Sequence, residues 1–120
     1  MAEHNDKGKA GELVAKLHLE GLGYEILQTN WRFERCEVDI IARQRDILVF
    51  VEVKTRRNAI FGLPEESVGP SKQENLAKAA TAYLRQENSE AEIRFDIVAI
   101  ILDKETEEIH HIEDAFFPSV

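Results

Sequence analysis

The segment ILVFVEV, residues 47–53, constrains the fold more than any other part of the sequence, because it is apolar at both sets of alternating positions. A strand with this pattern is usually buried on both faces and therefore lies at the centre of its sheet. The segment nevertheless contains Glu52, and Lys54 follows directly after it. Because a buried charge is costly unless another group satisfies it, the segment predicts a polar site beside a hydrophobic core.

The flanking patterns place this strand in an α/β fold. Apolar residues recur at helical spacing over residues 6–22, and Ser71 to Glu74 fit a capping box that opens a second helix. Gly11 inside the first helix predicts the close approach of another group. Strands are predicted over residues 24–33, 37–43, 47–55, 93–102 and 108–112, the third of which contains the segment ILVFVEV. The order αβββαβ, with an additional final strand, predicts one domain over residues 1–120, with a mixed central sheet flanked by helices.

The distribution of charge leaves two interpretations open. The net charge is −8, but residues 86–120 hold ten acidic and two basic side chains, whereas residues 1–85 hold thirteen of each. Residues 43–57 carry five basic side chains and two acidic ones, which is compatible either with a basic patch or with solvated charges at strand ends. A single cysteine, Cys36, excludes a disulfide within the chain. With no apolar run long enough to cross a membrane and no signal-peptide pattern, we expect a cytoplasmic protein with no membrane partner.

The hairpin before and after Asp46 predicts a pair of facing carboxylates. If its loop has an even length and is centred between Arg45 and Asp46, paired residue numbers sum to 91, and Asp39 faces Glu52. Directly paired residues have Cβ atoms ~4.5–5.5 Å apart on the same face. Two carboxylates there would bind Mg²⁺ or Mn²⁺, and Lys54 shares their face. An odd loop would move Asp39 off the site, and both charges would otherwise simply reach solvent at strand ends.

The same residues carry a resemblance to known nucleases. Asp39 followed by Glu52-Val53-Lys54 resembles the PD-(D/E)xK pattern of the restriction-endonuclease-like nucleases, with Val38 in place of the proline. More widely, the chain resembles the YraN family of uncharacterised bacterial proteins, which is similar to the archaeal Holliday-junction resolvases. The segments that carry this resemblance are GKAGELVAKLHLEGLGYEILQTNWR, CEVDIIA, LVFVEVKTR, Phe61-Gly62 and RFDIVAI. Cys36 departs from the glycine expected at its position.

The resemblance implies a restriction-endonuclease-like αβββαβ core with the active site on the central hairpin. It implies that Asp39 and Glu52 are metal ligands, with the backbone carbonyl of Val53 as a further ligand. Lys54 would orient or activate the attacking water. Glu12 matches a position that often faces the same metal centre, although a solvated helix residue is the alternative interpretation.

The leading hypothesis is a Mg²⁺- or Mn²⁺-dependent endonuclease that acts on DNA. We expect Arg56, Arg57 and Lys72 to contact phosphates, since Lys72 lies in the first turn of the second helix, where free backbone N–H groups favour anions. Branched DNA as the substrate rests on analogy of fold, and a homodimer would match its two symmetric strands. Two alternatives remain open: a non-catalytic nucleic-acid-binding or assembly module, and a hydrolase of a smaller phosphate substrate.

Several polar residues lie outside this proposed site. Arg94 and Asp96 share a face of the fourth predicted strand, and we expect them to form a buried pair. His110 and His111 are adjacent in a strand and point to opposite faces, so at most one of them would serve a metal site. His18 has no partner at ligand spacing in the sequence.

Overall fold

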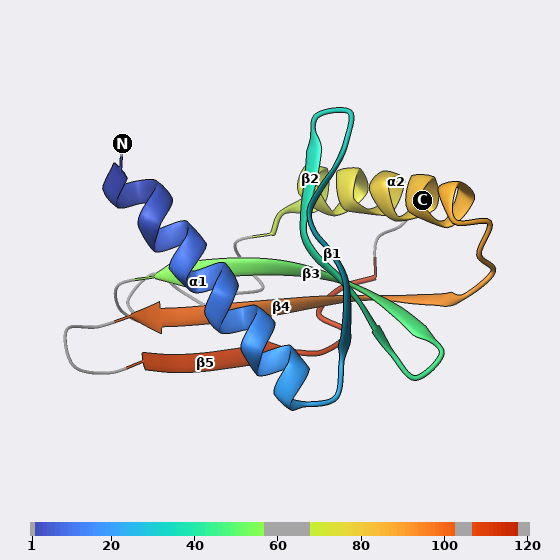
Figure 1. The fold of residues 1–120 in the computed structure, drawn as a ribbon. Coiled ribbons are helices and arrows are strands. Elements are labelled where there is room, and N and C mark those ends of the chain that lie inside the picture. The colour runs from blue at the N-terminus through green and yellow to red at the C-terminus, as the bar shows by residue number, and fades with distance from the viewer. Residues whose placement is uncertain (1, 57–67, 103–106, 118–120) are drawn as a thin grey trace.

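The computed structural model describes residues 2–56, 68–102 and 107–117. Two helices, α1 (Ala2–Gly21) and α2 (Pro70–Gln86), accompany five strands: β1 (Glu25–Phe33), β2 (Cys36–Gln44), β3 (Ile47–Arg56), β4 (Glu92–Leu102) and β5 (Glu107–Ile112). The strands form one sheet in the order β1-β2-β3-β4-β5, in which β3 and β4 run parallel and the other neighbours antiparallel. Figure 1 shows α1 lying diagonally across this sheet. The predicted α/β fold with a mixed sheet is confirmed.

Strand β3 is apolar at both sets of positions because each of its faces contacts a different hydrophobic core. Leu48 and Phe50 belong to the core that α2 covers, whereas Val49 and Val51 belong to the core that α1 covers. Burying one such side chain contributes about 1.5–3 kcal/mol. The central position expected for this strand is therefore confirmed, and Glu52, two residues after Phe50, falls on the α2 face.

The register of the central hairpin is the one that the sequence predicts. Gln44 pairs with Ile47 and Ile40 with Val51, so paired numbers sum to 91. A two-residue turn joins the strands, and Arg45 adopts the positive φ, 57°, that tight hairpin turns require. A shift of one residue would have turned every side chain of β2 to the other face of the sheet.

Both helices begin elsewhere than predicted. Helix α1 begins at Ala2 rather than near residue 6, since Ala and Glu are good helix formers and extend the helix towards the N-terminus. The capping box at Ser71 is wrong, because Gly69 is the N-cap of α2 and no side chain caps the helix by a hydrogen bond. Pro70 sets the start instead, since its fixed φ and missing N–H suit the first helical position.

Close packing brings α1 onto the C-terminal half of β3. A Cβ atom at Gly11 would overlap the hydroxyl group of Thr55, so only glycine allows the helix to approach this closely. The predicted close approach at Gly11 is confirmed. It also carries the neighbouring residue, Glu12, towards the end of the central hairpin.

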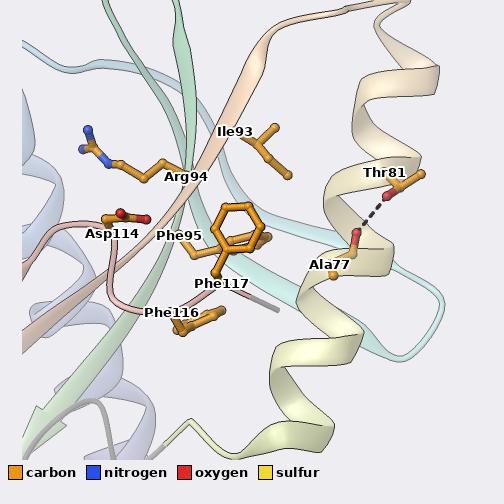
Figure 2. A pocket seen from close by; sticks show the side chains of 8 residues that line it. All are labelled: Ala77, Thr81, Ile93, Arg94, Phe95, Asp114, Phe116 and Phe117. Carbon is orange, nitrogen blue, oxygen red and sulfur yellow. Dashed lines mark hydrogen bonds between the residues drawn. The ribbon is translucent and has the colours of Figure 1, made fainter. Parts of the chain in front are cut away.

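The segment after β5 packs against the sheet beside α2. The N–H group of Ala115 donates to the carbonyl oxygen of Phe95 at 2.8 Å, and the rings of Phe116 and Phe95 stack with centroids 5.1 Å apart. Figure 2 shows the cavity of about 100 Å³ that lies between this segment and α2 and is lined mainly by apolar side chains. Neither of the two described helices combines the length and the apolar character that crossing a membrane requires.

Candidate metal and nucleic-acid site

The candidate site lies where strands β2 and β3 separate. Their paired register ends at Ile40 and Val51, and Figure 1 shows β2 curving away from β3 towards its start. One residue beyond the last pair, Oδ2 of Asp39 accepts a hydrogen bond of 2.8 Å from the backbone N–H of Val53. The Asp39 carboxylate therefore takes the place of a backbone acceptor. The paired register stops one residue short of Asp39 and Glu52, but the charge of Glu52 still acts on Asp39.

Glu52 is a buried carboxylate with one satisfied and one unsatisfied oxygen. Its side chain is 6% exposed, Nζ of Lys72 donates to Oε1 at 2.6 Å, and Nζ of Lys54 lies 3.6 Å from the same oxygen. Oε2 is buried and accepts no hydrogen bond within the described part of the chain. Leaving a buried polar atom unsatisfied costs about 1–3 kcal/mol, and more for a charged group, so a cation at Oε2 would stabilise this arrangement.

The pKa of Asp39 is raised, first by burial and then by neighbouring negative charge. Burial, and after it the charge of Glu52, raise the pKa of Asp39 to about 7, although the hydrogen bond from Val53 opposes this rise. Glu12 contributes to the same rise, which places its charge near Asp39. A divalent cation between these carboxylates would remove the repulsion that raises the pKa.

The pKa values of the two lysines shift in opposite directions, although Glu52 acts to raise both of them. Burial lowers the pKa of Lys54, and the neighbouring charge of Lys72 adds to this effect while Glu52 opposes it. Burial also acts against the charge of Lys72, but its hydrogen bond to Glu52 outweighs burial and raises its pKa. Lys72, which we predicted as a phosphate contact, is thus the closer counter-ion of a predicted metal ligand, and the sequence alone did not reveal this pairing.

Glu12 approaches the opening from α1 and has a partner that the sequence did not indicate. Its Oε2 accepts a hydrogen bond of 3.3 Å from Nδ2 of Asn30. Asn30 adopts a φ of 51° between the paired residues Thr29 and Trp31, opposite Asp39. Asparagine tolerates this left-handed conformation better than most residues, and here it lies beside the candidate site.

The predicted phosphate contacts are only partly placed. Arg56 is half-buried at the end of β3, and its Nη1 donates to the carbonyl oxygen of Thr55 at 3.4 Å. Arg57 lies outside the described residues, as do Phe61 and Gly62. The structure thus brings together Glu12, Asp39, Glu52, Lys54 and Lys72 at the opening of the hairpin.

The donor set suits a hard divalent cation. Carboxylate oxygens are the ligands that Mg²⁺ and Mn²⁺ prefer, and Oε2 of Glu52 is such an oxygen without a hydrogen-bond partner among the described residues. Among the described residues, no three His, Cys, Asp or Glu side chains are grouped closely enough to hold an ion by themselves. Asp39 and Glu52 would therefore hold the cation together with water, which matches the preference of Mg²⁺ for retaining several water ligands.

The raised pKa of Asp39 predicts a pH-dependent stability of the metal-free protein. Its folded pKa of about 7 exceeds the reference value of 3.8, so the folded state holds this proton more tightly. In EDTA, the free energy of unfolding should therefore fall as the pH rises from about 4 to about 7. Above this range Asp39→Asn should be more stable than the wild type by a few kcal/mol, since one pKa unit corresponds to about 1.4 kcal/mol.

Urea unfolding of both proteins across this pH range measures the difference. Glu37→Gln is the matched control, because Glu37 lies on the same strand in an ion pair of 3.2 Å with Arg32 at the surface. Stability curves of wild type and Asp39→Asn that remain parallel with pH would contradict the prediction.

The fold and this cluster together define the class of protein. A mixed sheet with a parallel β3–β4 pair, helices on its two faces and carboxylates beside lysines at the opened hairpin is consistent with a restriction-endonuclease-like α/β core. Residues 11–100 match the model of the family described as "Uncharacterised protein family UPF0102". The chain belongs to this family, and the resemblance to YraN is confirmed, since the two names denote the same family.

Relatives from several bacteria match nearly the whole chain. A UPF0102 protein of Flavobacterium psychrophilum is 48% identical over 117 residues, covering 98% of this chain and 98% of the relative. A UPF0102 protein of Bacteroides thetaiotaomicron is 45% identical over 118 residues, again covering 98% of both chains. One from Geotalea daltonii is 48% identical over 111 residues, covering 91% of this chain and 87% of the relative.

Proposed function

We propose that this protein is a Mg²⁺- or Mn²⁺-dependent nuclease that hydrolyses phosphodiester bonds of DNA, with branched or otherwise structured DNA as its substrate. One observation carries the proposal: a buried Glu52 with an unsatisfied oxygen lies at the opening of the hairpin where Asp39 has a raised pKa. A fold that serves only to bind has no need for two carboxylates in such a place, because their repulsion costs stability.

The residues of the opening would divide the work of hydrolysis. Asp39 and Glu52 would hold the divalent cation, which when bound lowers the pKa of a water molecule and polarises the phosphate. Lys54, a compact ammonium group on a flexible stem, would hold the attacking oxygen or a non-bridging phosphate oxygen. Lys72 would exchange its hydrogen bond with Glu52 for a contact with a DNA phosphate, and Arg56 and Arg57 would bind phosphates further along the strand.

A non-catalytic nucleic-acid-binding or assembly module is the second candidate function. The hydrogen bond of 2.6 Å from Lys72 to Glu52 favours it, because an internal cation already balances part of the charge that a metal would balance. The net charge of −8 favours the assembly form of this alternative, since a basic protein would bind DNA more readily.

Cleavage assays on a panel of DNA structures test the proposal. Supercoiled plasmid, single-stranded DNA and a four-way junction are each incubated with the protein in Mg²⁺, Mn²⁺ or EDTA. We expect cleavage with either cation and none in EDTA, with the junction cut fastest. Mn²⁺ should also raise the midpoint of thermal unfolding, because a ligand that binds only the folded state stabilises it by mass action.

A failure of both measurements would favour the binding module. If no DNA is cut and Mn²⁺ leaves the unfolding midpoint unchanged, while the junction still binds, the nuclease proposal is wrong. Sedimentation of the protein with and without the junction tests the homodimer that belongs to this proposal, since a junction offers two equivalent strands.

A further inference from the structure

A second polar cluster lies on the face of the sheet that α1 covers, apart from Glu52 and Lys54. It joins His18 of α1 and Tyr24, which precedes β1, to Arg94 and Asp96 of β4 and His111 of β5. Asp96 pairs in register with Val51, which belongs to the core under α1. Because paired residues lie on the same face of a sheet, Asp96 is on the α1 face. Five side chains from distant parts of the sequence thus meet between the helix and the sheet.

Asp96 is the fixed centre of this cluster. It is fully buried, its Oδ1 accepts hydrogen bonds from Nε of Arg94 at 2.8 Å and from the N–H of Asp114 at 3.1 Å, and its Oδ2 accepts one from Nη2 of Arg94 at 3.0 Å. The expected Arg94–Asp96 pair is confirmed. Burial alone would raise the pKa of Asp96, but the hydrogen bonds from His111, Arg94 and Asp114 outweigh it and lower the pKa to about 2.

The ionised Asp96 fixes the tautomer of His111. An ionised carboxylate only accepts hydrogen bonds, so Nε2 of His111, which lies 2.8 Å from Oδ2 of Asp96, carries a proton. In the neutral ring the lone pair is then on Nδ1. This is the arrangement by which a carboxylate orients a metal-binding histidine in many metal sites.

The lone pair of His111 faces a second imidazole. Nδ1 of His111 lies 3.2 Å from Nε2 of His18, and the two rings meet edge-on at 73°. Two imidazole nitrogens on one tetrahedral Zn²⁺, with bonds of about 2.0–2.1 Å, would be roughly 3.3–3.4 Å apart. In this hydrogen bond the proton is carried by Nε2 of His18, whose lone pair is then on its Nδ1. Binding an ion through Nε2 therefore requires His18 to change to its other neutral tautomer, with the proton on Nδ1. A rotation of the half-exposed ring would then turn both lone pairs towards a common ion.

We propose that His18 Nε2 and His111 Nδ1 form a binding site for a divalent transition-metal ion of the Zn²⁺ type, oriented by Asp96 and completed by water. The ion would clip the C-terminal end of α1 to β5. Neutral imidazoles favour such ions over Mg²⁺, so this site and the carboxylates of the hairpin select different cations.

Zn²⁺ titrations of the full chain test this site. The background is Asp39→Asn/Glu52→Gln, which removes the carboxylates of the hairpin, and the readouts are calorimetric binding and the midpoint of thermal unfolding. We expect a single Zn²⁺ to bind and, at about 100 times Kd, to multiply the ratio of folded to unfolded protein by about 100. Mg²⁺ should have no effect in this background.

The variant that decides the question is His18→Ala, on the half-exposed side of α1. It should weaken Zn²⁺ binding at least 10-fold, the loss expected even for removal of an orienting partner. His110→Ala is the matched control, because His110 is the exposed neighbour of His111 and pairs with Glu108 at 3.2 Å. Unchanged binding in His18→Ala, a loss in His110→Ala, or no Zn²⁺ binding by the folded background protein would each overturn the proposal.

Discussion

Replacing Asp39 by Asn or Glu52 by Gln is expected to reduce metal-dependent DNA cleavage by roughly 1000-fold or more, with the protein still folded. Both substitutions keep the shape of the side chain and remove the negative charge that would hold the cation. Loss of the cation removes several kcal/mol of transition-state stabilisation, and each 1.4 kcal/mol or so is a tenfold change in rate. Initial rates of junction or plasmid cleavage in Mn²⁺ measure the effect.

The fold should survive because both substitutions leave the two hydrophobic cores of the sheet unchanged. In the Asp39→Asn variant the new side-chain amide oxygen would still accept the hydrogen bond from Val53, and relief of the repulsion with Glu52 should stabilise the folded state. Circular dichroism and thermal unfolding check this point. Glu37→Gln, purified in the same way, controls for contaminating nucleases and should cleave within about twofold of the wild type. Wild-type rates in both Asp39→Asn and Glu52→Gln would remove the proposed site.

Asp96→Ala is expected to lower the free energy of unfolding by about 3–5 kcal/mol, the cost of breaking a buried ion pair on one side. The substitution leaves Arg94, whose side chain is 15% exposed, without its carboxylate, and it also removes the acceptor of His111. Both groups would remain in the interior with unsatisfied donors. Urea unfolding at neutral pH measures the loss.

The exposed His110–Glu108 pair provides a matched comparison for the buried His111–Asp96 pair. Glu108→Ala should cost less than about 1 kcal/mol, since its side chain is 61% exposed and surface pairs contribute little. The folded pKa of Asp96, about 2, lies below the reference value of 3.8, so its stabilising effect is complete above that value and is lost as the pH falls towards 2. The difference between wild type and Asp96→Ala should therefore shrink over this range. Equal losses for the two carboxylates would show that burial does not govern their contributions.

The strand pattern and the hairpin register were accessible from the sequence because they are local. Alternating and doubly apolar segments predicted β2 and β3 to within one residue. The two-residue loop of Arg45 and Asp46 predicted the hairpin register, in which paired residue numbers sum to 91. Helix starts were less predictable. Pro70 and Ser71 are both acceptable near a helix start, and the helix begins at Pro70 with Gly69 as its N-cap.

The closest counter-ion of Glu52 comes from a distant part of the sequence. The sequence placed Lys54 on the face of Glu52, two residues away, but the closest ammonium group belongs to Lys72, twenty residues away at the start of α2. Only the packing of α2 against this face of the sheet determines that distance. Because of this packing, Lys72, which we predicted as a phosphate contact, forms a hydrogen bond with Glu52.

The sequence by itself determined which segments are strands and helices, the central position of β3 and the pairing of the hairpin that carries Asp39 and Glu52. Periodicity and turn length specify these features within about twenty residues. The tertiary structure alone decided that the rings of His18 and His111, 93 positions apart, lie within hydrogen-bond distance, and that Lys72 reaches Glu52. Side chains on different elements meet only when burial of two hydrophobic cores has fixed how the helices lie on the sheet, and no spacing in the sequence encodes that geometry.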